Sequence, residues 1–230
     1  MTGFTSLILL RHGHTAANGQ GDHVPMSGGR TDTALSPLGA EQAAALAERL
    51  GPDLFGVPIY SSPLSRALRT VEALAALTGT PVRLHEGLRE IDCGELEGMA
   101  VSEVKWRYPR EWEENLRHED PDFRWPGGES YAEFRERCLR AAAEVAAAHR
   151  GGRALVVTHA GVISQALGST AGVSAARWDL NRPGNASVTE LLWGPGGVTL
   201  VRFNDQTHLA PPVLPVETLT APATTRRHAG

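Results

Sequence analysis

The sequence predicts an α/β fold, a three-layer α/β/α sandwich built around a mostly parallel, mixed sheet. Short apolar runs typical of strands buried on both faces alternate along the chain with segments in which apolar residues recur at helical spacing. The chain has 230 residues, of which 41% are hydrophobic, so it is long and apolar enough for one such core. We therefore expect a single domain over residues 1–210 and a disordered, proline- and threonine-rich tail over residues 211–230.

The first half of the chain contains alternating strand and helix signals. The expected strands are residues 6–10, 57–62 and 81–85, of which the last is the weakest. Ser36 and Pro37 are typical of an N-cap followed by proline at the first helical position, and apolar residues then recur through Leu50. Pro63 starts a second helix, with Arg66 in its first turn.

The strand at residues 81–85 is followed by a stretch that runs to residue 128 and is rich in charge, tryptophan and proline. We expect this stretch to be irregular and to cover the active site. Ser130 and Glu133 then match a capping box at the start of a helix that Gly151 ends, and another helix begins around Val162. The remaining strands are residues 154–158, 187–193 and 198–203, and the last two form a β-hairpin.

Charge and cysteine content narrow the class of protein. A formal net charge of −4 gives no general attraction to nucleic acid or to acidic membranes, so we expect a small ligand bound by local charges. Cys93 and Cys138 lie far apart and outside any C-x-x-C pair, which favours neither a disulfide framework nor a thiolate zinc site. No signal peptide or membrane-spanning run is recognisable. We expect a cytoplasmic protein.

Two of the predicted strands end directly before residues that can bind and attack an anion. Arg11 and His12 follow the strand at residues 6–10, and His159 follows the strand at residues 154–158. In sheets of this kind, ligands bind outside the carboxyl ends of the strands. We therefore expect Arg11, His12 and His159 to lie in one site.

The residue types in this site suit the binding and transfer of a phosphate group. The guanidinium groups of Arg11 and Arg66 can each bind phosphate oxygens through two N–H groups. His12 offers a neutral imidazole as nucleophile, and His159 can donate to an oxygen that gains negative charge. Glu90 can act as the acid that protonates the leaving oxygen. Such a site needs neither a metal ion nor another cofactor.

The nucleophile and the acid have opposite needs for protons. His12 must keep a lone pair on its attacking nitrogen, which is ensured if the other ring nitrogen donates to a backbone carbonyl and nearby arginines disfavour protonation. Glu90 must be protonated when the ester oxygen leaves, and an adjacent phosphate dianion favours the protonated form of a carboxyl group. The same group can then activate water to hydrolyse the phosphohistidine.

Four ordered sequence blocks resemble those of the histidine phosphatase superfamily, whose fold is phosphoglycerate mutase-like. Residues 11–18 resemble its R-H-G-x-T-x-x-N opening, and residues 61–67 resemble S-S-P-L-x-R-A. Residues 88–98 resemble L-x-E-x-x-x-G-x-x-E-G, and residues 158–161 match T-H-[AG]-G. The resemblance covers nearly the whole chain from residue 6 to residue 203, and it implies this fold and a phosphatase or mutase activity.

The resemblance also implies roles for individual residues. His12 corresponds to the phospho-acceptor, Glu90 to the proton donor and His159 to the second histidine. The phosphate-binding positions that we derive from it are Arg11, Asn18, Arg66, His159 and the adjacent Ala160. Gly28 and Gly29 form either an ordinary turn or a segment whose backbone amides approach the phosphate, so Gly29 is a further phosphate-binding candidate.

Within the superfamily, the sequence resembles the phosphatase branch more than the glycolytic mutases. The mutases read E-R-H-Y-G where residues 90–94 read E-I-D-C-G, and residues 126–130 match a P-G-G-E-S segment common among the phosphatases. Two features depart from the family pattern. His14 replaces the usual glutamate or glutamine, and the loop from residue 18 to residue 29 is longer than usual.

Several alternatives remain open. His12 and His14 are spaced like two ligands of a zinc hydrolase, although no second histidine cluster completes the set. The chain could also be a cofactor-dependent phosphoglycerate mutase, or a non-catalytic module that binds a phosphorylated ligand. Trp106, Trp112 and Trp125 could stack on a substrate ring or anchor a loop to the core.

The function that these observations favour is that of a phosphoric monoester hydrolase. We expect it to act on a small phosphorylated metabolite through a phosphohistidine at His12, with no nucleic acid or membrane partner. The motifs encode phosphate recognition but not the identity of the metabolite. The oligomeric state is equally open, and an exposed sheet edge is the place where a homodimer could form.

Overall fold

The computed structural model describes residues 3–19 and 21–209, so the predicted disordered tail over residues 211–230 lies outside the described residues. The strands are β1 (Thr5–Arg11), β2 (Ile59–Ser61), β3 (Val82–Leu84), β4 (Arg153–Thr158), β5 (Val188–Gly194) and β6 (Gly197–Asp205). They form one sheet in the order β3-β2-β4-β1-β5-β6. β1 to β4 pair in parallel, whereas β5 is antiparallel to both neighbours. The predicted mixed, mostly parallel sheet is confirmed.

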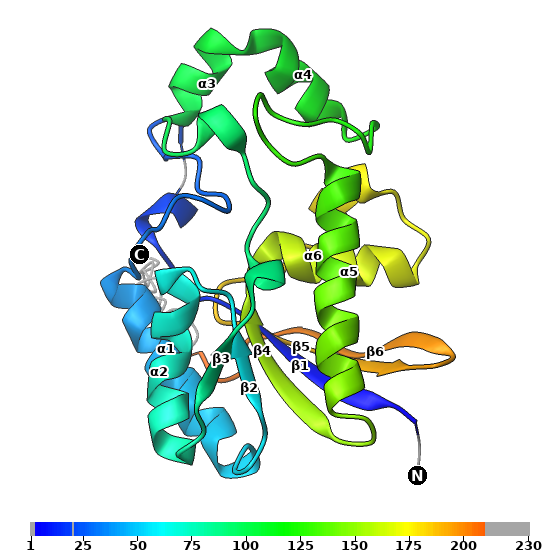
Figure 1. Cartoon of the computed structure of the whole chain (residues 1–230). Coiled ribbons are helices and arrows are strands. Elements are labelled where there is room, and N and C mark those ends of the chain that lie inside the picture. The colour runs from blue at the N-terminus through cyan, green and yellow to red at the C-terminus, as the bar shows by residue number, and fades with distance from the viewer. Residues whose placement is uncertain (1–2, 20, 210–230) are drawn as a thin grey trace, which may run out of the picture.

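Helices cover both faces of this sheet. The helices are α1 (Pro37–Leu50), α2 (Ser65–Thr78), α3 (Val101–Arg107), α4 (Pro109–Arg117), α5 (Tyr131–Ala148) and α6 (Ala160–Thr170). Short 3₁₀ segments are η1 (Ala16–Asn18), η2 (Gly51–Asp53), η3 (Glu86–Leu88), η4 (Gly94–Leu96) and η5 (Ala175–Asn181). α1 and α2 lie on one face and α5 and α6 on the other, which confirms the three-layer sandwich (Figure 1). Among the described helices, none combines the length and apolar character that crossing a bilayer requires.

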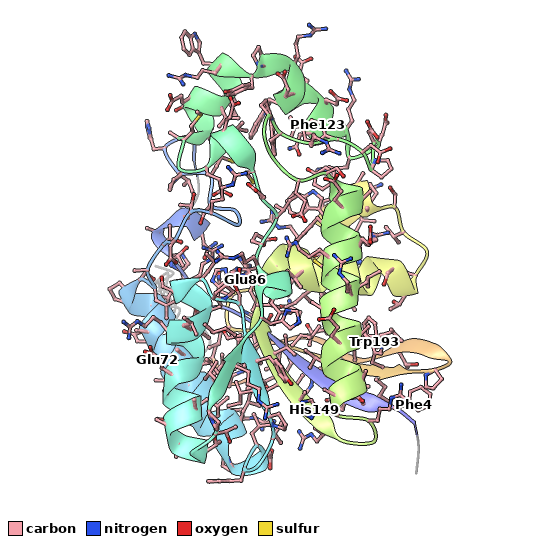
Figure 2. The ribbon with its side chains drawn as sticks, in the orientation of Figure 1. Phe4, Glu72, Glu86, Phe123, His149 and Trp193 are labelled. Carbon is pink, nitrogen blue, oxygen red and sulfur yellow. The ribbon has the colours of Figure 1, made fainter. Side chains whose placement is uncertain are left out.

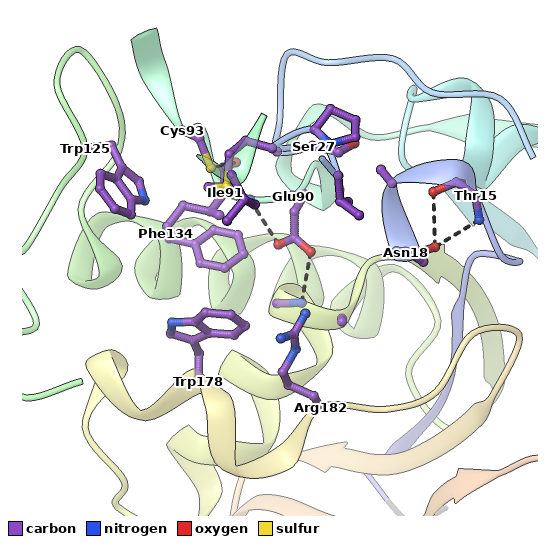
Figure 3. A pocket seen from close by; sticks show the side chains of 18 of the residues that line it. Thr15, Asn18, Ser27, Glu90, Ile91, Cys93, Trp125, Phe134, Trp178 and Arg182 are labelled. Carbon is purple, nitrogen blue, oxygen red and sulfur yellow. Dashed lines mark hydrogen bonds between the residues drawn. The ribbon is translucent and has the colours of Figure 1, made fainter. Parts of the chain in front are cut away.

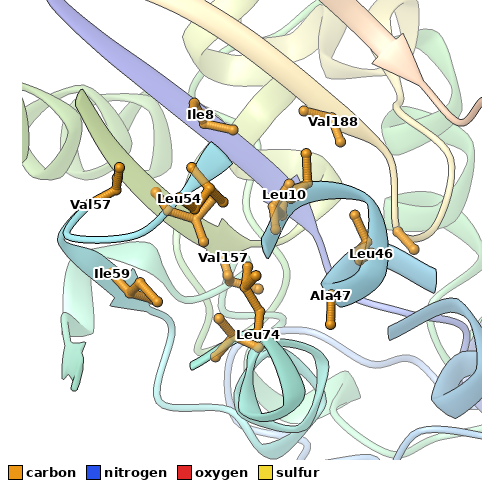
Figure 4. Close-up of a cluster of buried hydrophobic side chains, with 14 of the residues drawn as sticks. Ile8, Leu10, Leu46, Ala47, Leu54, Val57, Ile59, Leu74, Val157 and Val188 are labelled. Atoms are coloured by element: carbon orange, nitrogen blue, oxygen red, sulfur yellow. The ribbon is translucent and has the colours of Figure 1, made fainter. Parts of the chain in front are cut away.

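The hydrophobic core lies on both faces of β1. Ile8 and Leu10 pack in one cluster with α1 and α2 (Figure 4), while Leu7 and Leu9 pack in another with α5 and α6. All four side chains are at most 4% exposed, which confirms that this strand is buried on both faces. Buried apolar surface contributes roughly 25 cal/mol per Å² to stability. This packing therefore fixes β1 in the interior of the sheet, with Arg11 at the carboxyl end of the strand.

Residues 101–117, which we predicted to be irregular, are helical. α3 and α4 follow one another there, at one end of the molecule (Figure 1). The apolar residues of these helices are too sparse to produce a helical repeat, since Val104 is buried but Trp106 is 78% exposed. The helices pack on a separate apolar cluster that includes Val104 and Phe123. Phe123 lies at the opposite end of the molecule from Trp193 (Figure 2).

The starts of α5 and α6 shape the region near the active site. The predicted capping box is confirmed, because Ser130 Oγ accepts from Glu133 N at 3.2 Å and Glu133 Oε2 accepts from Ser130 N at 2.9 Å. The helix predicted around Val162 starts earlier, at Ala160, with His159 as its N-cap residue. The first backbone amides of α6 therefore follow directly on His159.

Candidate active site

The carboxyl ends of β1 and β4 bring two histidines together. The two strands pair in parallel up to their last residues, so the residues that follow, His12 and His159, lie side by side with ring centroids 5.2 Å apart. Arg11 and His12 line a cavity that is also lined by Glu90 and by Arg66 from the first turn of α2. The structure thus brings together the residues that the sequence predicts as catalytic.

His12 is held as a neutral imidazole. Its side chain is buried, and Nδ1 lies 2.8 Å from Gly13 O. Because a carbonyl oxygen can only accept, Nδ1 carries the proton and Nε2 of the neutral ring keeps its lone pair. Burial, followed by the charges of Arg66 and Arg11, lowers the pKa of His12 to about 3. His12 Nε2 is therefore unprotonated at neutral pH, as a nucleophilic role would require.

His159 is fully buried, and both of its ring nitrogens are engaged. Nδ1 accepts from Arg66 Nε at 3.2 Å, and Nε2 lies 2.8 Å from Ser62 Oγ. Because a guanidinium N–H can only donate, Nδ1 carries no proton and Nε2 donates to Ser62. Burial, followed by the charges of Arg66 and His12, lowers the pKa of His159 well below its usual value.

This geometry differs from the prediction that His159 donates to a phosphate oxygen. In the structure His159 Nδ1 is an acceptor, and His159 does not line the cavity. Donation to phosphate requires that Arg66 Nε turn away from His159 and that Nδ1 gain a proton. Both changes are favoured by an entering dianion, which attracts the guanidinium and stabilises a protonated imidazole.

Arg66 is almost fully buried, at 2% exposure, and is oriented by backbone carbonyls. Nη1 donates to Thr31 O at 2.8 Å and Nη2 donates to Gly28 O at 2.9 Å. Each terminal nitrogen of a guanidinium carries two protons, so one proton on each remains for an anion.

Arg11 supplies a second cation with an unused donor. Its Nη1 donates to Pro183 O at 2.7 Å, while Nε is buried without a partner among the described residues. Burial, followed by the charge of Arg182, lowers the pKa of Arg11 to about 10, so the group stays charged at neutral pH. A buried donor without an acceptor is unfavourable, and an anionic oxygen that reaches it would satisfy it.

Glu90 is positioned by two backbone amides. Its Oε1 accepts from Ile91 N and its Oε2 accepts from Gly161 N, both at 3.0 Å (Figure 3). Gly161 lies in the first turn of α6, and a Cβ atom at this position would lie only 2.2 Å from Glu90 Oε1. The glycine of the T-H-A-G block is therefore required by the close approach of Glu90.

The remaining predicted phosphate-binding residues differ in their positions. Asn18 lines the cavity, and because its Oδ1 accepts from Thr15 N and Asn185 Nδ2, its own amide nitrogen is the group left to donate. Ala160 also lines the cavity, at the start of α6. Gly29 does not line it, and its amide already donates to Ile91 O at 2.7 Å. The amide of Gly29 is therefore not free for a phosphate, contrary to our expectation.

Glu97 organises the site without lining the cavity. Its carboxylate accepts from the backbone amides of Gly28, Arg30 and Thr31 at 3.0 to 3.1 Å, and from Cys93 N at 3.1 Å. The same loop supplies the carbonyl groups of residues 28 and 31, which orient Arg66. The sequence places Glu97 in a family block, but nothing in the sequence indicates that it closes this loop.

Arg137 holds the backbone around Glu90 in place. Its guanidinium donates to the carbonyl oxygens of Gly87, Arg89 and Glu90 at 2.9 to 3.2 Å, and Nη2 pairs with Glu129 Oε2 at 2.7 Å. Arg137 projects from α5, and we did not predict this role, because its position in the helix has no distinguishing pattern.

The cavity in front of these residues has a volume of about 360 Å³. Its charged lining residues are Arg11, Arg66, Glu90 and Arg182, beside the neutral His12. Much of the rest is apolar, and includes Val24, Pro25, Met26, Val101, Trp112, Trp125, Phe134 and Trp178 (Figure 3). The segment predicted to cover the site, which runs to residue 128, contributes Glu90, Ile91, Cys93, Val101, Trp112, Asn115 and Trp125. Trp178 and Arg182 belong to no sequence block and are not predicted.

His14 points away from this chemistry. Its Nδ1 lies 2.8 Å from Ser36 Oγ at the start of α1, and it does not line the cavity. Within residues 3–19 and 21–209, no group of three or more His, Cys, Asp or Glu side chains is arranged to hold a metal ion. Among the described residues, His12 and His14 therefore have no third side chain arranged with them to hold a metal ion.

Comparison with known proteins identifies the family. The model of the histidine phosphatase superfamily (branch 1) matches residues 7–206. The metal-independent phosphoserine phosphatase of Arabidopsis thaliana is 34% identical over 161 residues, which are 69% of this chain and 66% of that protein. The probable phosphoglycerate mutase GpmB of Salmonella paratyphi C is 30% identical over 213 residues, 90% of this chain and 96% of that protein.

A solved structure shows the same relationship. The native structure of a mycobacterial glucosyl-3-phosphoglycerate phosphatase matches with a TM-score of 0.73 and 32% identity, over 86% of this chain and 98% of that one. The chain belongs to the histidine phosphatase superfamily, as its sequence blocks predict, and has the phosphoglycerate mutase-like fold. Its similarity to phosphatases of the superfamily supports a phosphatase, while one of these relatives is a probable mutase.

Proposed function

We propose that this protein hydrolyses a small phosphate monoester through a phosphohistidine intermediate at His12, without a metal ion or another cofactor. The observation that carries the proposal is the state of His12, a buried neutral imidazole whose Nδ1 is held by Gly13 O beside two arginine charges. Such a ring presents an unprotonated nitrogen to an electrophile, and the adjacent cations attract a phosphate to it.

In the first step, the phosphate dianion is bound by Arg11 and Arg66, with the Asn18 amide and the α6 amide at Ala160 as further donors. His12 Nε2 attacks phosphorus and forms a P–N bond while the ester P–O bond breaks. The leaving oxygen takes its proton from Glu90. The two guanidinium groups offset the charge that spreads over the phosphoryl oxygens.

In the second step, water replaces the alcohol. The Glu90 carboxylate accepts a proton from water as its oxygen attacks phosphorus, the P–N bond breaks, and His12 returns to its neutral form. Inorganic phosphate then leaves, and Glu90 carries the proton needed for the next turnover. His159 acts in both steps once Arg66 has turned to the phosphate, by donating to a phosphoryl oxygen.

The relatives support a small phosphorylated metabolite as substrate, because the names of two of them specify phosphoserine and glucosyl-3-phosphoglycerate. The family match over residues 7–206 supports the prediction that residues 1–210 form one domain. Cys93 and Cys138 are both buried free thiols, which supports the expectation of a reducing, cytoplasmic setting.

A mutase is the second candidate, because the alignment with the probable mutase GpmB spans 96% of that protein and 90% of this chain. A mutase returns the phosphoryl group from the histidine to a phosphoglycerate rather than to water. Conversion of 3-phosphoglycerate to 2-phosphoglycerate in the presence of a bisphosphoglycerate primer, at a rate above that of phosphate release, would favour this candidate.

The test of the proposal is hydrolysis of p-nitrophenyl phosphate in excess chelator, compared between wild type and His12→Ala. We expect chelator-resistant activity that falls by at least about a thousandfold in the variant. Quenching in alkali, where phosphohistidine survives, should trap a labelled protein from a radiolabelled ester in the wild type only.

His14→Ala is the matched control, since this histidine lies two residues away but outside the cavity. It should retain activity. Activity abolished by the chelator would contradict the proposal and support a metal site, and phosphate binding without turnover on any ester would support the non-catalytic module.

A further inference from the structure

The part of the cavity beyond the phosphate site is lined by aromatic side chains, and we call it the aromatic compartment. Five aromatic side chains line it, namely Trp112 of α4, Trp125, Tyr131 and Phe134 of α5, and Trp178 of η5. The rings of Trp112 and Trp125 have centroids 6.4 Å apart with their planes inclined at 33°. Trp125 and Phe134 are buried, whereas Trp112 and Trp178 are half-buried and form the walls. We propose that this compartment binds the alcohol part of the substrate and that this alcohol carries an aromatic ring. The inference rests on the proposed phosphatase function.

The distribution of charge in the lining supports an uncharged alcohol. Arg182 lies close enough to Arg11 that its charge is the second cause, after burial, of the lowered pKa of Arg11. Glu90 likewise acts on both Arg11 and Arg66, which indicates that it lies near the two phosphate-binding candidates. The thiol of Cys93, which also lines the cavity, is uncharged because burial raises its pKa well above the usual value.

Apart from Arg182 at its edge, the compartment therefore lacks a partner for the charged groups of an amino-acid-like alcohol. An ammonium or carboxylate placed among these rings would lose its hydration without gaining a counter-ion, which is strongly unfavourable. Arg182 is the exception at the edge of the compartment, because its guanidinium stacks on Trp178 at 4.7 Å from the ring centroid. Its charge also acts on Arg11, so it faces the phosphate end as well.

A sugar fits the compartment less well than an aromatic ring. Hydroxyl groups need hydrogen-bonding partners when they are buried. Most hydroxyls in the lining are already engaged, since Tyr131 Oη donates to Asn115 Oδ1 and the hydroxyl of Thr15 to Asn18 Oδ1. Trp178 Nε1, which has no partner among the described residues, and the amide nitrogens of Asn18 and Asn115 are too few to satisfy the several hydroxyls of a sugar. Aromatic pairs, by contrast, gain roughly 0.5–1.5 kcal/mol beyond their buried area.

The volume limits the size of the ring system. Ligand sites in proteins usually have volumes of about 300–1,000 Å³, so a cavity of about 360 Å³ lies near the lower end. Once a phosphate group occupies its part of the cavity, the remaining space suits an alcohol with a single ring or with two fused rings. The chemistry is unchanged: the ester P–O bond breaks, and the aromatic alcohol leaves with the proton from Glu90.

The first test compares esters with similar leaving groups, because aryl phosphates are intrinsically more reactive than alkyl phosphates. Benzyl phosphate and 1-naphthylmethyl phosphate are alkyl esters that carry rings, and they are compared with phosphoserine, 3-phosphoglycerate and glucose 6-phosphate. We expect kcat/KM for the ring-bearing esters to be higher by about tenfold to a hundredfold, the discrimination that hydrophobic pockets commonly reach. A higher kcat/KM for any of the other three esters would overturn the inference.

The second test uses two tryptophans of neighbouring helices. Trp112→Ala should lower kcat/KM for 1-naphthylmethyl phosphate about tenfold and leave that for phosphoserine within about twofold. Trp106→Ala is the matched control, because Trp106 is 78% exposed and outside the cavity, and it should change neither value. An equal loss on both esters in a Trp112→Ala protein that melts like wild type would also overturn the inference.

A third variant keeps the inference testable if Trp112→Ala does not fold. Val101→Lys adds a cation to the apolar lining, so it should weaken turnover of the naphthylmethyl ester and improve turnover of phosphoserine. No change in their ratio would contradict the inference. Failure of the proposed function itself gives a different result, namely no hydrolysis of any ester by the wild type or full activity of His12→Ala.

Discussion

Arg66 Nε donates to His159 Nδ1 across 3.2 Å, while the terminal nitrogens of the same guanidinium donate to Thr31 O and Gly28 O. These contacts fix the plane of the guanidinium and the tautomer of His159 together. In the proposed mechanism, the bound phosphate competes with His159 for Arg66, and this exchange is what allows His159 to become a donor.

The fork geometry of Arg66 predicts that lysine will not replace it. In Arg66→Lys the charge is kept, but one ammonium cannot contact both carbonyl groups, His159 and a phosphate. We expect kcat/KM for p-nitrophenyl phosphate to fall by about a hundredfold to a thousandfold, the range seen when one donor to a transition-state oxygen is lost. Arg69→Lys, one turn further along α2 at an exposed position, is the control and should behave like wild type. Comparable activity of Arg66→Lys and wild type would show that charge alone suffices.

Burial of a neutral His12 predicts that stability falls as the pH falls. The pKa of His12 is about 3 in the folded protein and 6.5 in the unfolded reference. Between these values the unfolded chain binds a proton that the folded protein does not, so acid favours unfolding, whereas above about pH 6.5 neither state binds it and the effect vanishes. Each such proton changes the free energy of unfolding by about 1.4 kcal/mol per pH unit.

The measurement is urea unfolding of wild type and His12→Asn at several pH values between 4 and 7. The free energy of unfolding of the variant should depend less steeply on pH, by about 1.4 kcal/mol per unit, below about pH 6. His23→Asn, at an exposed position, is the matched control. Parallel pH dependences of wild type and His12→Asn would mean that His12 is not held neutral by the fold.

The carboxylate of Glu97 predicts a coupled loss of stability and activity. In Glu97→Gln one of the two acceptor oxygens becomes an NH₂ group that faces backbone amides of the loop at residues 28–31. We expect a loss of about 1–3 kcal/mol in the free energy of unfolding. Turnover should fall as well, because this loop orients Arg66. Glu95→Gln at an exposed position is the control, and equal melting temperatures for the two variants would contradict the role of Glu97.

The sequence predicts those parts of the site that depend on local patterns. Arg11, His12 and His159 follow apolar runs that form strands, and parallel pairing of these strands brings the residues together whatever the details of the loops. The start of α5 is equally local, because its capping box involves residues three positions apart. Glu90 follows no such local pattern, since it lies on a loop, and the family block is what singles it out as the candidate acid.

The supporting contacts could not be predicted because they join distant segments. Glu97 contacts a loop 66 to 69 residues earlier in the chain, and Arg137 contacts carbonyl groups 47 to 50 residues earlier. The tautomer of His159 could not be predicted for the same reason, because it depends on Arg66, 93 residues away. α3 and α4 were missed because they bury few residues, so their stability comes from a small cluster rather than from a long apolar stripe.

The close approach of Gly161 to Glu90 predicts that alanine at position 161 will disable the acid. The added Cβ would lie 2.2 Å from Glu90 Oε1 and 3.0 Å from Phe134 Cε1, so the carboxyl group must move away from the position where Gly161 N and Ile91 N hold it. Alanine is a better helix former than glycine by about 1 kcal/mol, which offsets part of the strain in α6. We therefore expect a folded protein with a misplaced acid.

If Glu90 is misplaced, the loss of kcat/KM should depend on the leaving group of the ester. An alkoxide needs the proton of the acid far more than p-nitrophenolate does, and general acid catalysis typically contributes about a hundredfold or more. Gly161→Ala should therefore lower kcat/KM for an alkyl phosphate about a hundredfold but for p-nitrophenyl phosphate less than about tenfold. Glu90→Gln should show the same pattern, because it removes the proton without moving the backbone. An equal loss on both esters in Gly161→Ala would instead mean that the start of α6, with its amide at Ala160, had moved away from the phosphate.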